Sequence, residues 1–196
     1  MTDAPVFKLP PFVTHQRSLA SEIPSIDWGL KVVGVERAWK HTKGAGVKVA
    51  VFDTGVDTMH ADLAGAIAAA KDFTRSRFGP EDRNGHGVHC AGIIGARGKI
   101  LGVAPECSLY IGKVLGDDGS GDGAGIAAGI DWAVTQGVDV ISMSLGSPQQ
   151  DVRIAAAIRR ATAAGIIIVV AAGNDGRSNS VNWPAKMAEV LAVSAI

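Results

Sequence analysis

Runs of apolar residues separated by amphipathic segments divide most of the chain into alternating predicted strands and helices. Five runs are rich in β-branched residues and are bounded by polar or glycine-containing turns, as buried strands are: Val47–Asp53, Ser108–Leu115, Val138–Ser144, Ile166–Ala172 and Val190–Ile196. Between them, Gly123–Gln136 has a helical apolar face, and Asp151–Ala164 begins with an N-cap residue and stops at Gly165. Strands that alternate with helices predict an α/β fold with a mostly parallel sheet and helices on both faces.

The N-terminal region does not share this pattern. Residues 1–26 are rich in proline and aperiodic, so we expect an extension there and a compact domain over residues 27–196, starting near Trp28. The extension has neither the basic start nor the apolar run of a secretory signal, and no apolar run of the chain reaches membrane-spanning length. The sequence therefore predicts a soluble, cytoplasmic protein.

The composition adds limits on partners and size. The 196 residues are 47% hydrophobic, enough for the core of one domain. Lys and Arg number 19 and Asp and Glu also number 19, so the formal net charge is zero. We therefore expect neither nucleic acid nor a membrane as a partner. The spacing of Cys90 and Cys107 supports no disulfide framework.

Three polar segments lie where a parallel sheet forms its sites, beyond the carboxyl ends of strands. Asp53 ends one predicted strand, Asn174 follows another, and His86 opens a predicted helix in a glycine-rich segment. A carboxylate can orient an imidazole that takes a proton from a hydroxyl, and an amide can donate to the developing oxyanion. Each residue alone is more often a turn, cap or structural residue. Together they supply every role of serine hydrolysis except the hydroxyl.

Four segments resemble the subtilisin family of serine proteases, in the family's order: VAVFDTGVDTMHADL, NGHGVHCAGIIG, ISMSLG and AAGNDG. The resemblance runs from about Trp28 to Ile196. It implies a three-layer αβα fold and an endopeptidase with polypeptide substrates, in which Asp53 and His86 belong to the catalytic triad and Asn174 to the oxyanion hole. It also implies two substrate-binding segments, a strand that pairs with the substrate and one wall of the primary specificity pocket; they are Gly119, Ser120 and Gly121, and Ser144, Leu145 and Gly146.

The resemblance leaves the nucleophile unassigned. The family carries its catalytic serine in a Gly-Thr-Ser-Met-Ala segment, and Ser178, Ser180 and Ser194 lie in no such segment. We therefore expect the serine and the C-terminal part of the fold to lie beyond residue 196, with that remainder as a partner and this chain inactive alone. The alternative is a non-catalytic pseudoprotease that binds peptides in the retained cleft. A homodimer is a further partner that the family allows.

The N-terminal extension resembles a more specific branch. Phe7–Phe12 (FKLPPF) is similar to the inhibitory extension of intracellular subtilisins, which implies that Leu9, Pro10, Pro11 and Phe12 lie across the active site. The two prolines fix φ and remove two backbone donors, so such a strand can fill a cleft without aligning a scissile bond. The plain alternative is a solvated arm.

One further segment suggests a metal site. Asp62 matches a Ca²⁺ ligand of family members, so structural Ca²⁺ is the cofactor that the resemblance raises, although the chemistry needs none. The loop Gly95–Leu101, however, carries Arg97 and Lys99 where a hard cation wants oxygens. Cys90, one turn after His86, is expected to pack beneath the imidazole.

Two rival interpretations fit the residues less well. A zinc site at His86, His89 and Cys90 has no evident fourth ligand, and these side chains diverge around a helix. Gly123–Ala128 fits a dinucleotide-binding glycine pattern, but a polar loop separates it from the preceding strand.

Overall fold

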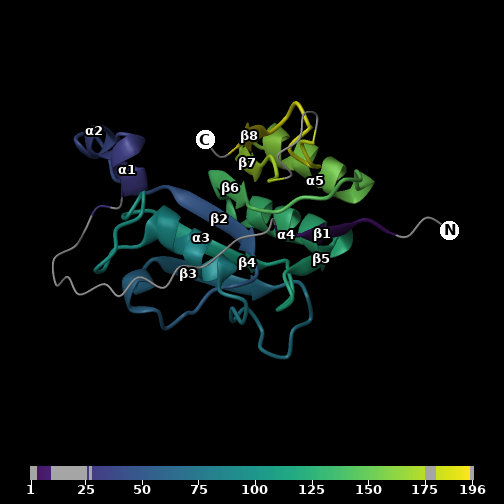
Figure 1. Ribbon diagram of the computed structural model, residues 1–196, viewed down its shortest axis with the longest axis horizontal. Coiled ribbons are helices and arrows are strands. Elements are labelled where there is room, and N and C mark those ends of the chain that lie inside the picture. Colours follow the sequence, from purple (N-terminus) through teal and green to yellow (C-terminus); the bar gives the residue numbers. More distant parts are fainter. Residues whose placement is uncertain (1–3, 10–25, 27, 175–179, 195–196) are drawn as a thin grey trace.

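A six-stranded parallel sheet forms the centre of the molecule (Figure 1). The computed structural model describes residues 4–9, 26, 28–174 and 180–194. The order of the strands is β3-β4-β2-β6-β7-β8, and all neighbours run parallel. Their bounds are β2 Lys48–Asp53, β3 Ile67–Asp72, β4 Ser108–Lys113, β6 Val140–Met143, β7 Ile167–Ala171 and β8 Leu191–Val193. The predicted α/β fold with a mostly parallel sheet is confirmed.

Helices cover both faces of this sheet and give the three layers (Figure 1). Helix α3 (His86–Gly95) packs on one face, and α4 (Gly123–Gln136) and α5 (Val152–Ala163) pack on the other. Alternate residues of β2 enter the two resulting cores, because side chains of a strand point to opposite faces. Val49 and Val51 join the α3 side, whereas Ala50 and Phe52 join the side of α4 and α5.

Capping residues fix where the two long helices begin. Asp122 accepts hydrogen bonds from Ala124 N and Gly125 N at the start of α4, and Asp151 accepts one from Arg153 N at the start of α5. These carboxylates satisfy backbone donors that a helix cannot pair internally. The Arg153 guanidinium also hydrogen-bonds Asp151, which outweighs burial and lowers the pKa of that carboxyl. The predicted N-cap at Asp151 is thus present in the structure.

The N-terminal segment contributes to the fold. Strand β1 (Val6–Lys8) pairs antiparallel with β5 (Ser120–Asp122) in a separate two-stranded sheet. Phe7 is only 1% exposed and belongs to the core beneath α4 and α5. The described part of the extension is therefore built into the molecule rather than extended into solvent. Because α4 follows β5 and not a strand of the parallel sheet, the strand–turn–helix context for a dinucleotide is not met there.

Shorter elements complete the described chain: α1 (Trp28–Val32), α2 (Val35–Trp39) and the 3₁₀ helix η1 (Ala61–Leu63). Within the described ranges, no helix has both the length and the apolar character needed to cross a membrane.

Candidate active site

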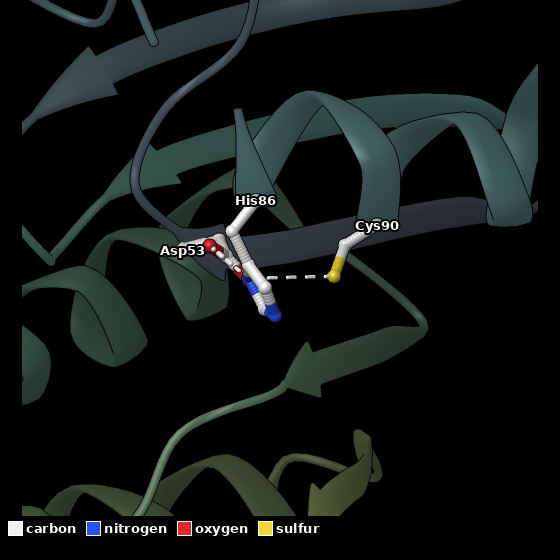
Figure 2. Close-up of side chains that lie close together, drawn as sticks. All are labelled: Asp53, His86 and Cys90. Carbon is white, nitrogen blue, oxygen red and sulfur yellow. Dashed lines mark hydrogen bonds and ion pairs between the residues drawn. The ribbon is translucent and has the colours of Figure 1, made fainter. Parts of the chain in front are cut away.

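Asp53 and His86 meet at the carboxyl end of the central strand (Figure 2). Asp53 is the last residue of β2 and His86 the first residue of α3. His86 Nδ1 lies 2.8 Å from Asp53 Oδ1 and 2.9 Å from Oδ2, and the two residues are 9% and 1% exposed. In Figure 2 the other ring nitrogen of His86 points away from the carboxylate. A buried carboxylate that accepts a hydrogen bond from Nδ1 keeps the proton on that nitrogen. Nε2 can then act as the general base that accepts a proton.

Backbone and side-chain donors hold the end of β2 in place. Thr54 N donates to Asp53 Oδ1 at 2.7 Å, and the backbone carbonyl of Asp53 accepts from Val114 N. The fully buried ammonium of Lys113 donates to the carbonyl of Thr54 and forms an ion pair with Asp117 at 2.8 Å. A buried charge needs such partners, because desolvation without them is costly. The orientation of Asp53 is therefore set by groups on several sides.

Cys90 lies beside the pair, one turn further along α3 (Figure 2). Its Sγ is 3.7 Å from His86 Nδ1 and 3.7 Å from Ser144 Oγ. Burial, followed by the negative charge of Asp53, raises the pKa of the thiol to about 12. A neutral thiol thus packs against the imidazole. One ligand atom each of Asp53, His86 and Cys90 fall within 4.8 Å of one another, whereas His89 is exposed and outside this group.

The two predicted substrate-binding segments lie on either side of the chain's own strand β1. Lys8 N donates to Gly146 O at 3.2 Å, and Gly146 N donates to Lys8 O at 3.4 Å. On the other side, β1 pairs with Ser120–Asp122, and Leu9 N donates to Gly119 O at 3.2 Å. Of the predicted inhibitory residues, Leu9 is thus in the cleft, whereas Pro10, Pro11 and Phe12 lie outside the described residues.

Asn174 follows β7 and is exposed. It lines a groove that also contains Leu9 and Gly146. It also borders an open cavity of about 360 Å³ at the carboxyl ends of β6, β7 and β8. Other residues around this cavity include Ser142, Ser144, Val169, Ala171, Val193 and Ser194. The structure therefore brings the predicted oxyanion residue and the predicted pocket-wall residue Ser144 to one cavity.

Two residues beside the pair were missed by sequence reasoning. Thr54 is fully buried, and its hydroxyl donates to Asp82 Oδ1 at 2.9 Å. Burial alone would raise the pKa of Asp82, but hydrogen bonds from Gly85, Val88, Asn84 and Thr54 lower it below its ordinary value. An acidic residue shortly before a glycine that opens a helix is the local signal that points to such a cap.

The surroundings of Asp62 do not fit a calcium ligand set. Its Oδ1 accepts from Lys99 N at 2.6 Å, and its backbone carbonyl accepts from Arg97 N at 2.8 Å. The Arg97 guanidinium donates to the carbonyls of Gly65 and Cys107. Hard cations need six to eight free oxygens. Here Asp62 Oδ1 and the Asp62 carbonyl already accept from N–H donors, and the Arg97 guanidinium places a positive charge in the same region.

The chain resembles characterised proteases along most of its length. It is 44% identical over 203 residues to the "Major intracellular serine protease" of Bacillus subtilis (strain 168), with 96% of this chain and 63% of the relative covered. It is 41% identical over 199 residues to an "Intracellular serine protease" of Paenibacillus polymyxa, with 96% and 60% covered. Subtilisin DY of Bacillus licheniformis is 40% identical over 179 residues, with 88% and 65% covered. The chain thus spans about three fifths of the length of these curated relatives.

A family model gives the same assignment. The model described as the subtilase family (peptidase S8) matches residues 44–196, which contain Asp53, His86 and Asn174. Together with relatives above 40% identity over nearly the whole chain, this match establishes that the chain belongs to the subtilase family.

Proposed function

We propose that the protein carrying this chain is a serine endopeptidase in which Asp53 and His86 form two thirds of the catalytic triad. The observation that carries the proposal is the buried contact of His86 Nδ1 with both oxygens of Asp53. Asp53 holds the imidazole in the tautomer that carries its proton on Nδ1, so that Nε2 is the proton acceptor, and stabilises the imidazolium that forms. His86 takes the proton of a serine hydroxyl supplied from outside this chain and later returns it to the leaving amine. Asn174 donates to the developing oxyanion.

The strand β1 supports the choice of a polypeptide substrate. An extended segment lies in the cleft with backbone hydrogen bonds on both sides, to Gly146 and to Gly119. Recognition through main-chain bonds suits a peptide of varied sequence, with side-chain pockets adding preference. A substrate chain would take the place that β1 fills here. The relatives named as intracellular proteases support a location inside the cell.

The proposal is tested by comparing two histidines of α3 in the full-length protein. His86→Ala should abolish hydrolysis of a chromogenic peptide, whereas His89→Ala should not, because His89 is exposed on the same helix. A serine-directed phosphonylating inhibitor should block the wild-type activity. Residues 1–196 alone should be inactive, and mixing with a C-terminal piece that carries the serine should restore hydrolysis. Retained activity in His86→Ala would refute the mechanism; a folded full-length protein that binds peptides without cleaving them would favour the pseudoprotease.

We further propose that β1 inhibits the enzyme by filling its own cleft. Phe7 anchors the strand because its side chain is 1% exposed, whereas neighbouring Val6 is 51% exposed. Burying a phenylalanine contributes roughly 1.5–3 kcal/mol. Together with the backbone bonds of Lys8 and Leu9, this holds the segment where a substrate would bind.

Removal of the segment tests this inhibition. Deleting Met1 to about Arg17 should raise activity on short peptides, and Phe7→Ala should have the same effect in part. Val6→Ala is the matched control and should leave activity unchanged. The segment is tethered, so inhibition should not depend on enzyme concentration. Equal activity with and without the segment would favour a solvated arm.

A further inference from the structure

The helix that carries His86 begins without a capping side chain of its own. The N-cap position of α3 is Gly85, in a left-handed conformation with φ 97°, and it has no side chain to accept a hydrogen bond. The first backbone N–H groups of a helix have no partner within the helix. Here Gly87 N donates to Thr54 Oγ1 at 2.9 Å, and Val88 N donates to Asp82 Oδ2 at 2.8 Å. The cap of α3 is therefore supplied by residues outside the helix.

Asp82 connects these contacts. Its Oδ1 accepts from Thr54 Oγ1, from Asn84 N and from Gly85 N, each at 2.9 Å. The carboxylate thus accepts four hydrogen bonds, and bonds to an ionised acceptor are stronger than neutral ones. Because the hydroxyl of Thr54 donates to Asp82, its lone pairs are directed to Gly87 N. One carboxylate thereby fixes the loop, the first turn of α3 and the residue that follows Asp53.

The backbones of α3 and of the segment after β2 are also closely packed at this junction. A Cβ placed on Gly87 would lie 2.2 Å from Gly55 O, so the first turn of α3 rests directly on the backbone after Thr54. His86 immediately precedes Gly87, and Asp53 immediately precedes Thr54. Any shift of the helix along the strand end therefore changes the Nδ1–carboxylate distance directly.

We propose that Asp82 is a positioning residue for proton transfer: acting through the Thr54 hydroxyl, it locks the first turn of α3 onto the end of β2 so that Asp53 holds His86 in the geometry of a base. This rests on the proposed protease function. Asp82 touches neither ring nitrogen of His86 in the described contacts, and it acts through the placement of the helix. A misplacement of about 1 Å can cost about 10²-fold in rate.

Thr54 provides the matched pair of variants for a test in the full-length protease. Thr54→Val keeps the shape but removes the hydroxyl, so kcat should fall by about 10²-fold with KM nearly unchanged. Thr54→Ser restores the hydroxyl and should recover most of the rate. Asp82→Asn places an amide donor among N–H donors, so it should reproduce the loss seen with Thr54→Val. The double variant should be no worse than either single variant, because both break the same link.

A second readout does not depend on turnover. The Nδ1 proton shared by His86 and Asp53 should give a low-field proton resonance in wild type and in Thr54→Ser, which should weaken or vanish in Thr54→Val and Asp82→Asn. The resonance is also measurable in a protein without activity, so failure of the proposed function and failure of this proposal are distinguishable. Unchanged kcat and an unchanged resonance in the folded variants would overturn the proposal. Global unfolding of both variants would also overturn it, since Asp82 would then serve folding alone.

Discussion

The two sides of the cleft differ in how completely the described residues build them. On the His86 side, Asp53 and Thr54 are at most 1% exposed, and the charged groups Asp82 and Lys113 have several hydrogen-bond partners each. On the Asn174 side, the amide residue is exposed and borders an open cavity, and every residue of the edge strand β8 is exposed. Leu191 and Val193 of that strand are 59% and 55% exposed.

This difference shows that one part of the proposed catalytic site is built by neighbouring residues of this chain. The proposed base is assembled where β2 ends and α3 begins, from residues 53–55 and 82–90, which contact one another directly. An apolar edge strand is usually covered by further chain or by a partner. If the proposed function holds, we expect the cavity beside Asn174 to be completed by the chain that carries the proposed serine. The His86 side should tolerate little change, whereas the Asn174 side should depend on that additional chain.

Among the variants that compare the two sides, Asp53→Asn on the His86 side should have the largest effect. The amide presents a donor to Nδ1 and favours the wrong tautomer, so kcat should fall by about 10⁴-fold with little change in KM. Steady-state kinetics on a short chromogenic peptide measure it. Asp131→Asn is the control, because Asp131 forms an exposed ion pair with Arg160 on the helical surface. A loss below tenfold would remove Asp53 from the triad.

Asn174→Ala probes the other side of the cleft. Removal of one oxyanion donor should lower kcat by roughly 10²–10³-fold while KM changes little, since the donor acts on charge that develops only in the transition state. The same peptide assay measures it, and the exposed amide of Gln150 supplies the control variant Gln150→Ala. If the two variants have equal rates, Asn174 is not the donor and the comparison of the two sides loses its functional meaning.

A smaller effect is expected from added volume at the junction of α3 and β2. Gly87→Ala would force a methyl group against the backbone of Gly55 and should lower the free energy of unfolding by about 1–3 kcal/mol. Gly92→Ala in the same helix has open space around it and should gain about 0.5–1 kcal/mol from helix propensity. Urea denaturation of inactive full-length protein measures both. Equal shifts would show that the junction is not tightly packed.

Features determined by residues close together in the sequence were predictable, whereas features that depend on long-range contacts were not. Val47–Asp53 was predictable as a strand because β-branched residues suit a strand buried on both faces, and the structure has Lys48–Asp53. Strand β3 was missed because IAAAKD is rich in alanine, which favours helices, and its pairing with β4 makes it a strand. The bounds of β1 were not predicted from the residue pattern, because its pairing with β5 is a long-range contact; only the resemblance pointed to a segment in the cleft. Asp53 and His86 were predicted from their motifs, and the structure brings them into contact, whereas Asp82 was missed because its hydrogen bond with Thr54 is a contact across the fold.

The smallest expected effect is that of calcium on the Asp62 loop: we expect Ca²⁺ to cause no change there. Lys99 N donates to Asp62 Oδ1, so a cation bound by this carboxylate would have to displace that hydrogen bond and face the Arg97 guanidinium in the same loop. The measurement is amide hydrogen exchange at Lys99, which reads this loop even if Ca²⁺ binds elsewhere in the full-length protein. Exchange at Lys99 should be the same with Ca²⁺ and with a chelator. Asp62→Ala should speed it equally in both, because the carboxylate is the acceptor of that N–H. Calcium-dependent protection at Lys99 that disappears in Asp62→Ala would show that Asp62 is a metal ligand after all, and that the loop rearranges to free its oxygens.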